Sequence, residues 1–366
     1  MTMYSEKVFL SATCGVNIDD EYILWAESLD GDLYKYDLIR EKNEFVNSPK
    51  AAGHYGKAFS CMLRHQEKIY MIALTDAYEI MEYNINTHQI QLKYQNIKKK
   101  VEIFNSFFIE DKIYLFPSFL DEDVCIYSLK EDSAEYIRWD NILPSSNCFL
   151  RENVVNVSQH ANKFYGAIWN TPYIFRLEMT PKIICEMTNL GESYHTEGII
   201  ASERELYITL MERKGVLCIR QDGKIEEIDC LESVQDSESN KIPYIMTIIY
   251  EQQIILFPGE GNNQIRIINR QTNKQTVLSY PDCFRRRQSG RLFWKPILYK
   301  SKLILLPFCG NGMLILDLNN YQITYKKWKN KDLESFIKKI STNALFDSKR
   351  NKGQNLGECI YHLLGS

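Results

Sequence analysis

Three consecutive arginines, Arg285, Arg286 and Arg287, form the densest group of side chains able to bind an anion, and Arg291 and Trp294 follow closely. A guanidinium group binds a carboxylate or phosphate through two parallel hydrogen bonds, so this cluster is a candidate ligand or partner site. A charged run in a loop is also common on a solvated surface. Both interpretations place these residues in an exposed loop.

A second candidate is the GEGNN segment at 259–263, where Glu260 and Asn262 offer hydrogen-bonding groups to a ligand. Loops that cradle phosphate lead into a helix whose first amides hold the anion. Here the next residues, QIRIIN, have the composition of a strand. A permissive turn is therefore expected, and a nucleotide site is not.

The six histidines show neither HExxH nor HxH spacing, and GxSxG is absent. A metal site would need loops from different parts of the chain to converge, as His54 and His195 would have to do. We therefore predict no metal and no cofactor. A Cys/His pair for nucleophilic chemistry stays open, although Cys14 and Cys61 are more simply small residues that face the core.

The elements that position these residues follow a repeat. Short polar turns precede apolar runs that recur every 42 to 51 residues. That period is typical of a four-stranded propeller blade. The seven runs are YILW at Tyr22, IYMI at Ile69, IYLF at Ile113, FYGA at Phe164, LYIT at Leu206, IILF at Ile254 and LILL at Leu303.

Other residues keep register with these seven anchors. Pro117, Pro258 and Pro307 lie four residues beyond their anchors, where proline, which lacks a ladder donor, suits the end of a strand. Turn-forming side chains lie fourteen or fifteen residues beyond the anchors and predict the hairpin between the third and fourth strands of each unit. They are Asp37, Asn84, Ser128, Asn269 and Asp317.

The fold class predicted is therefore all-β, a seven-bladed propeller of four-stranded antiparallel blades over residues 1–330. A propeller with another number of blades, a sandwich and a solenoid are the alternatives. Residues 331–366 have apolar side chains at helical spacing and predict a short helical tail packed on the propeller. The sequence does not define how the ring closes, although KVFL at 7–10 is a candidate strand for it.

The repeat resembles the broad kelch/WD40-like superfamily of propellers over about residues 8–328. The chain has no double glycine of the kelch type, and the GH and WD dipeptides of WD40 blades occur once each, at Gly53-His54 and Trp139-Asp140. It is also similar to divergent propeller proteins of bacterial genomes. No catalytic motif of a family matches, so the resemblance implies a fold and assigns no functional residue.

Residues nine and eight positions before each anchor are predicted to lie near the central channel. Among the first set, Glu197 is the best candidate for a catalytic acid or base, because a carboxyl group responds strongly to burial and to nearby charge. An ion pair or a solvated channel residue is the alternative role for Glu197. The second set, here called the channel position, consists of Cys14, Cys61, Asn105, Asn156, Gly198, Met246 and Lys295.

Ligands of propellers usually meet the face formed by the loops between second and third strands and by the connections between blades. Aromatic and charged residues in those segments have the composition of interface anchors. The residues predicted to bind a ligand or partner there are His54, Tyr55, Trp169, Tyr194, His195, Glu260, Asn262, Arg285, Arg286, Arg287, Trp294 and Lys295.

Two functions follow. The first is a non-catalytic module that presents this face to a peptide or protein. The alternative is an enzyme of the lyase, epimerase, cyclotransferase or glycosidase type that uses the central pocket. A glycosidase of the retaining type would need two carboxylates about 5 Å apart. A deep channel with converging acid and base groups would favour an enzyme, and a plugged channel would leave only the rim.

Composition limits the partners. The formal net charge is −3, which gives no general attraction for nucleic acid or anionic membrane. No run of 18 apolar residues and no secretory signal is found. The ten cysteines are widely spaced without a CxxC pair, as expected of reduced thiols in a cytoplasmic protein. The oligomeric state is not predicted.

Overall fold

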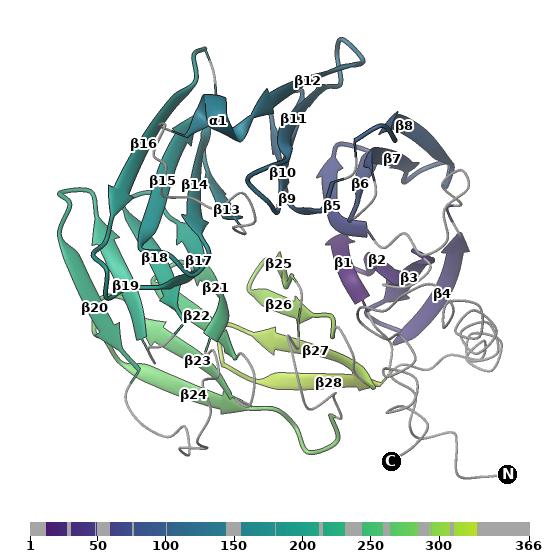
Figure 1. Cartoon of the computed structure of the whole chain (residues 1–366). Helices are drawn as coiled ribbons and strands as arrows, with labels where there is room; N and C mark the ends of the chain where they lie inside the picture. Colours follow the sequence, from purple (N-terminus) through teal and green to yellow (C-terminus); the bar gives the residue numbers. More distant parts are fainter. Residues whose placement is uncertain are drawn as a thin grey trace, which may run out of the picture.

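The computed structural model describes residues 12–27, 31–47, 49, 59–74, 77–99, 101–143, 155–179, 181–211, 215–230, 244–258, 264–284, 293, 295–307 and 311–327. These residues form seven antiparallel sheets of four strands, each built from four consecutive strands of the chain. The sheets surround one axis as a seven-bladed β-propeller (Figure 1). This confirms the predicted fold class. The predicted helical tail and the KVFL segment lie outside the described residues.

The first blade contains β1 (Ala12–Asn17), β2 (Tyr22–Glu27), β3 (Leu33–Asp37) and β4 (Lys42–Asn47). The second contains β5 (Phe59–His65), β6 (Lys68–Ala73), β7 (Tyr78–Asn84) and β8 (Ile90–Asn96). The third contains β9 (Ile103–Ile109), β10 (Lys112–Pro117), β11 (Asp123–Ser128) and β12 (Ser133–Arg138), and is followed by the one-turn helix α1 (Trp139–Ile142).

The fourth blade contains β13 (Val155–His160), β14 (Lys163–Ile168), β15 (Tyr173–Glu178) and β16 (Ile184–Asn189). The fifth contains β17 (Thr196–Ala201), β18 (Glu205–Leu210), β19 (Gly215–Arg220) and β20 (Ile225–Asp229). The sixth contains β21 (Tyr244–Tyr250), β22 (Gln253–Pro258), β23 (Gln264–Asn269) and β24 (Gln275–Ser279), and the seventh contains β25 (Ile297–Tyr299), β26 (Lys302–Leu305), β27 (Gly312–Asp317) and β28 (Ile323–Lys327).

The register residues act as the sequence predicts, except that Pro307 lies two residues beyond the end of β26 at Leu305 and forms an isolated bridge with Phe293. Pro117 and Pro258 are the last residues of β10 and β22, where the backbone leaves the ladder. The side chain of Asp37 accepts hydrogen bonds from the amides of Ile39 and Arg40 at 2.9 and 2.7 Å. Asn84 and Asn269 accept bonds of the same kind in the second and sixth blades. Short polar side chains that bond their own backbone thus fix the hairpin between third and fourth strands.

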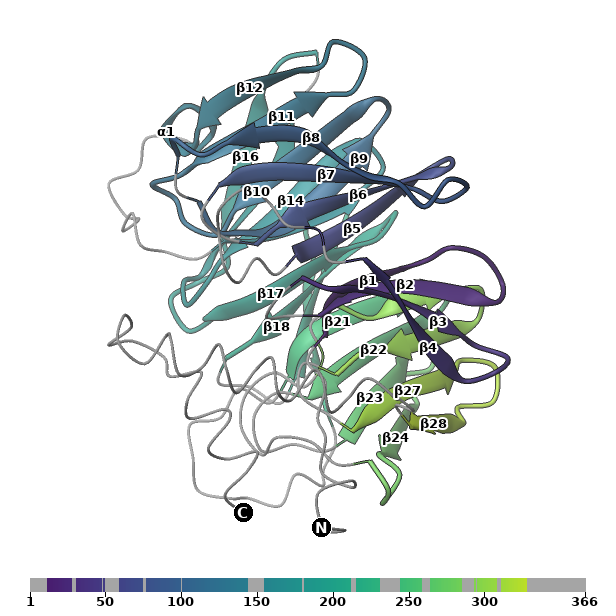
Figure 2. The same cartoon turned by 90° about the vertical axis from the view of Figure 1, so that its right-hand side faces the viewer.

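Apolar side chains between neighbouring sheets form the core. The interface of the third and fourth blades is aromatic, with Phe116 and Phe164 ring centroids 4.8 Å apart and Trp139 of α1 buried beside them. Figure 2 shows the ring from the side, with β5–β8 lying above β1–β4. Because each sheet buries both faces against its neighbours, the inner strands are held rigidly around the channel.

The ring closes between the first and seventh blades by packing and not by exchange of a described strand. Ile23, Trp25 and Tyr36 of the first blade share a core cluster with Ile304 and Leu306 of the seventh. The amide of Ala12 donates a hydrogen bond of 3.0 Å to the carbonyl of Pro307. At Gly15 any larger side chain would approach the Leu306 side chain to 2.8 Å, so glycine permits the close contact of the two blades.

Replacing Leu306 by alanine tests this closure. Leu306 is 3% exposed, and deletion of a buried leucine side chain removes contacts and leaves a cavity, so we expect a loss of about 2–4 kcal/mol in the free energy of unfolding. The matched control is Leu298→Ala in the same blade, where the side chain is 44% exposed and a change below about 0.5 kcal/mol is expected. Urea denaturation measures both. Equal losses in the two variants would contradict closure by packing at Leu306.

Candidate functional site

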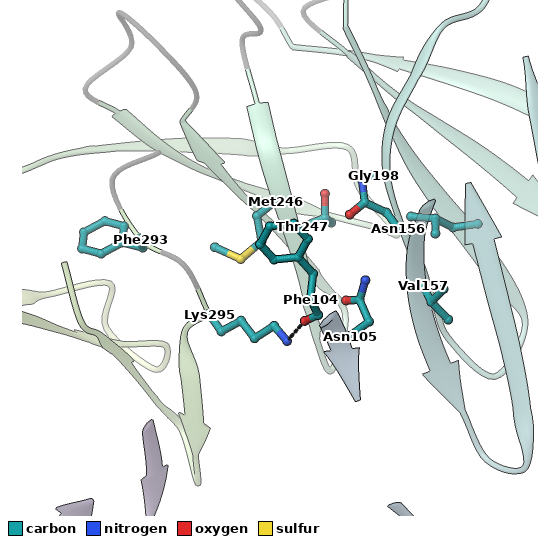
Figure 3. A pocket seen from close by; sticks show the side chains of 10 residues that line it. Phe104, Asn105, Asn156, Val157, Gly198, Met246, Thr247, Phe293 and Lys295 are labelled. Atoms are coloured by element: carbon teal, nitrogen blue, oxygen red, sulfur yellow. Dashed lines mark hydrogen bonds between the residues drawn. The ribbon is translucent and has the colours of Figure 1, made fainter. Parts of the chain in front are cut away.

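A pocket of about 140 Å³ lies in the central channel, close to the first residues of the innermost strands. Five blades contribute to it, and Figure 3 shows their side chains around one space. Five of the lining residues occupy the channel position of their blades. The pocket is lined by Phe104, Asn105, Asn156, Val157, Gly198, Ile199, Met246, Thr247, Phe293 and Lys295.

A β-bulge repeats at the start of the inner strands. In β17, Thr196 pairs with Leu210 and Gly198 with Thr209, so Glu197 is an extra residue in the ladder. The register shifts in the same way in β1, β5, β9 and β21, at the residue immediately before the channel position. A bulge bends the strand and re-aims the side chains beside it. It therefore directs one residue of each of these blades toward the channel.

A bulge also leaves a backbone carbonyl outside the ladder, and a buried carbonyl needs a donor. In two places the residue at the channel position of the preceding blade supplies the donor for this carbonyl. The Asn156 amide donates to the carbonyl of Glu197 at 2.5 Å, and the Cys61 thiol makes a long contact of 4.0 Å with the carbonyl of Phe104. Contacts of this kind connect adjacent blades around the channel.

β13 is the exception among these strands. Val155 pairs with Ile168 and Asn156 with Ala167, without a shift in register. The Asn105 side chain of the preceding blade therefore has no bulge carbonyl to reach. Asn105 lines the pocket, and its amide nitrogen is buried and has no hydrogen-bond partner among the described residues.

Lys295 extends across the channel. The backbone of Lys295 leads into the seventh blade, but its ammonium group contacts Cys61 Sγ of the second blade at 2.7 Å. The same group donates to the carbonyl of Phe104 in the third blade (Figure 3). Of the ten described residues that line the pocket, Lys295 alone carries a charge. The rest of the wall is apolar apart from Asn105, Asn156 and Thr247. An ammonium group in such surroundings interacts strongly with a negatively charged ligand.

Glu197 lies behind the wall of the pocket and does not line it. The residue is 1% exposed, and its carboxylate accepts a hydrogen bond of 2.5 Å from the indole nitrogen of Trp169. Trp169 belongs to the loop between β14 and β15. The carboxylate thus fixes this loop against the first residues of β17, while the carbonyl of Glu197 holds Asn156 in place.

Tyr194 and His195 lie in the connection that leads into β17, on the same face as Trp169. The backbone of this connection bonds the β14–β15 loop, because the Asn170 amide donates to the Thr196 carbonyl at 2.9 Å. The structure therefore brings Trp169, Tyr194, His195 and Glu197 together, and places Lys295 in the pocket. The other predicted binding residues, His54, Tyr55, Glu260, Asn262, Arg285, Arg286, Arg287 and Trp294, lie outside the described residues.

Sequence spacing indicated the channel position and also Phe104, which lies nine residues before its anchor Ile113, but it did not indicate Thr247 or Phe293 as pocket residues. Within the described ranges, no group of three histidine, cysteine, aspartate or glutamate side chains is placed to hold a metal ion. The seven described cysteines are free thiols. No helix in the described part of the chain is long and apolar enough to cross a membrane.

Two carboxyl groups lie close together on the same face of the third blade. The Glu102 amide donates to the Glu122 carboxyl group at 3.2 Å. Burial, supplemented by the nearby charges of Asp121 and Glu102, raises the pKa of Glu122 to about 7, although backbone hydrogen bonds oppose this rise. Burial also raises the pKa of Glu102. Glu122 therefore titrates near neutral pH.

Several solved lyases share this fold. Virginiamycin B lyase from Staphylococcus aureus, as a catalytically inactive variant with quinupristin, aligns with a TM-score of 0.59 and 11% identity over 85% of this chain and 96% of that one. Its selenomethionine-substituted form gives 0.53 and 14% over 74% and 84%. A streptogramin B lyase gives 0.52 and 12% over 74% and 82%.

At such low identity these similarities establish the propeller fold alone. No family model matches the chain, and no curated protein matches it either. The seven-bladed fold is therefore established, whereas the relation to the kelch/WD40-like superfamily stays a prediction.

Trp169→Phe tests the contact that anchors Glu197. The variant removes a donor from a buried carboxylate, so we expect it to lower the free energy of unfolding by about 1–3 kcal/mol. In a Glu197→Gln background the same change should cost less, because the charge that required the donor is gone. Urea denaturation of the four proteins gives the coupling. Additive effects would contradict a direct hydrogen bond.

Glu122 should make stability fall as pH rises. The folded protein holds the Glu122 proton up to a pKa of about 7, whereas the unfolded chain releases it near 4.5. The stabilisation that this group provides is therefore complete below about pH 4.5 and is lost as the pH rises through 7. Relative to Glu122→Gln, the wild type should lose roughly 1 kcal/mol between about pH 5 and pH 8, a value reduced for solvent screening. Parallel pH profiles would contradict the raised pKa.

Proposed function

We propose that the protein is an enzyme of the lyase type that acts on a small molecule in the channel pocket. The observation that carries the proposal is the position of Lys295, whose ammonium group lines the same pocket as Asn105, a residue whose buried amide nitrogen has no partner among the described residues. The fold similarity to lyases supports the same class. Of the two functions considered from the sequence, these observations favour the enzyme.

The chemistry of elimination suits these groups. In an elimination a base accepts the proton next to a carbonyl carbon, and the electron pair of the broken C–H bond passes onto the carbonyl oxygen. The double bond then forms between the two carbons as the group on the neighbouring carbon leaves with its bonding electrons. Fixed hydrogen-bond donors and a cation aimed at that oxygen stabilise the charge, and they do so most effectively where water is excluded. Lys295 and Asn105 would hold the ligand oxygen in this role. No described lining residue is a carboxylate, so the paired carboxylates of a glycosidase are not among them.

Glu197 then has a positioning role. Its buried carboxylate fixes Trp169, and its backbone carbonyl fixes Asn156 at the pocket wall. The sequence made Glu197 the candidate acid or base because the residue is ionisable and near the channel. Its place behind the wall favours support of Asn156 and of the loop over direct contact with a substrate.

The binding of a peptide or protein on the loop face is the second function predicted from sequence. It depends mainly on residues outside the described ranges. Trp169 and Tyr194 are only partly buried there. No contact within the described residues favours this function over the pocket.

Comparison of metabolites before and after incubation tests the proposal. Purified wild-type protein and Lys295→Met are incubated with a small-molecule extract of cells and followed by mass spectrometry. With wild type, a compound bearing a carboxylate or carbonyl group should disappear, and the masses of its products should add up to its own. Lys295→Met should convert it at least about tenfold more slowly, as expected when a charged hydrogen bond is lost.

Lys300→Met is the control for the loss of one positive charge. Lys300 is exposed and pairs with Asp20 at 2.8 Å on a hairpin, so this variant should behave as wild type. Products that together exceed the substrate by one water would indicate hydrolysis and contradict a lyase. A metabolite profile that wild-type protein leaves unchanged would contradict an enzyme.

A further inference from the structure

We infer that the ligand of the channel pocket is a small monocarboxylate with an apolar body about the size of a benzene ring. This inference rests on the proposed function, in that both use the same pocket. It makes a separate claim, because it concerns which molecules bind and not whether they react. Four features of the pocket carry it.

The first feature is the unused donor of Asn105. In the neighbouring blade the equivalent amide, Asn156, donates to the bulge carbonyl of Glu197. Asn105 lacks such an acceptor because β13 has no bulge. A buried amide nitrogen without a partner among the described residues is costly, so a ligand acceptor at this point would be favourable.

The second feature is the remaining donor capacity of Lys295. An ammonium group has three N–H donors. Within the described residues two are directed at Cys61 Sγ and at the carbonyl of Phe104. The third is available to a ligand, and a charged acceptor makes the stronger bond. Lys295 and Asn105 together thus offer one donor to each oxygen of a carboxylate.

The third feature is the number of charges. A phosphate carries about −1.5 to −2 at neutral pH and three strongly accepting oxygens, and it usually meets several cationic or amide donors. The pocket has a single cation among its described lining residues. A single carboxylate carries one negative charge, which matches the one positive charge of Lys295.

The fourth feature is the size and character of the remaining wall. Val157, Ile199, Met246 and Phe293 are apolar, and Gly198 adds no side chain, which leaves the space open on the fifth blade. An apolar cavity of about 150 Å³ in another protein holds one benzene molecule. The volume here, about 140 Å³, therefore suits a ring or a short branched chain.

Benzoate is the probe that tests the inference, with benzyl alcohol as its uncharged counterpart. Calorimetric titration of the full chain should show benzoate binding at least about tenfold more tightly than benzyl alcohol. Lys295→Met and Asn105→Leu should each weaken benzoate binding about tenfold and leave benzyl alcohol nearly unchanged. Gly198→Leu, which fills the space, should abolish the binding of both.

Gly198 does not have a positive φ angle, so a leucine there is compatible with the backbone. Lys300→Met again controls for charge and should bind benzoate as wild type does. Circular dichroism establishes that each variant is folded, and if Lys295→Met is not, Asn105→Leu and Gly198→Leu still distinguish the outcomes. Equal affinity for the two probes, no benzoate binding, or unchanged binding in Gly198→Leu would overturn the inference.

The two proposals fail separately. Benzoate binding without any converted metabolite would leave the ligand class intact and remove the lyase. Conversion of a metabolite without a carboxylate, together with no affinity for benzoate, would remove the ligand class and keep the enzyme.

Discussion

The unpaired backbone carbonyl at a β-bulge is the constraint on which the channel depends. Each bulge at the start of an inner strand releases one carbonyl from the ladder, and burial makes that carbonyl require a donor. Asn156 supplies a donor to the Glu197 carbonyl of the next blade. Lys295 supplies one to the Phe104 carbonyl from the far side of the channel. The same requirement therefore orders the side chains around the channel and joins blades to each other.

Differences among the seven blades turn this repeated geometry into a site. The backbone repeats, but the channel position holds two cysteines, two asparagines, a glycine, a methionine and a lysine. Gly198 opens space, Met246 gives an apolar wall, and Lys295 brings a charge. The missing bulge in β13 leaves the Asn105 donor without an acceptor among the described residues. The bulge carbonyls of Phe104 and Glu197 are hydrogen-bonded within the ring. The strand β13, which has no bulge, leaves the donor of Asn105 for a ligand.

Much of the fold could be predicted from sequence, because the signals are local. The anchors at Ile69, Ile113 and Ile254 are each the second residue of a second strand, as the period requires. Proline at strand ends and Asp or Asn in hairpins act through their own backbone geometry. The channel position could be counted from these anchors, and its residues Asn105, Gly198 and Lys295 line the pocket.

The bulges could not be predicted, because the extra residues Ser60, Phe104 and Glu197 share no chemical property. Their position is imposed by the bend of the strand and by the packing of the next blade. The burial of Glu197 behind the wall follows from its contact with Trp169, which is 28 residues away in sequence. The reach of Lys295 across the channel likewise depends on the three-dimensional closure of the ring, which no short stretch of sequence encodes.

A crystal structure with 4-bromobenzoate tests the central claim most directly, because anomalous scattering locates the bromine without prior assumptions. We expect one molecule in the channel, with its carboxylate oxygens within hydrogen-bonding distance of Lys295 Nζ and Asn105 Nδ2 and its ring against Met246 and Phe293. A bromine peak on the outer face only, or a carboxylate bound away from both donors, would contradict this claim.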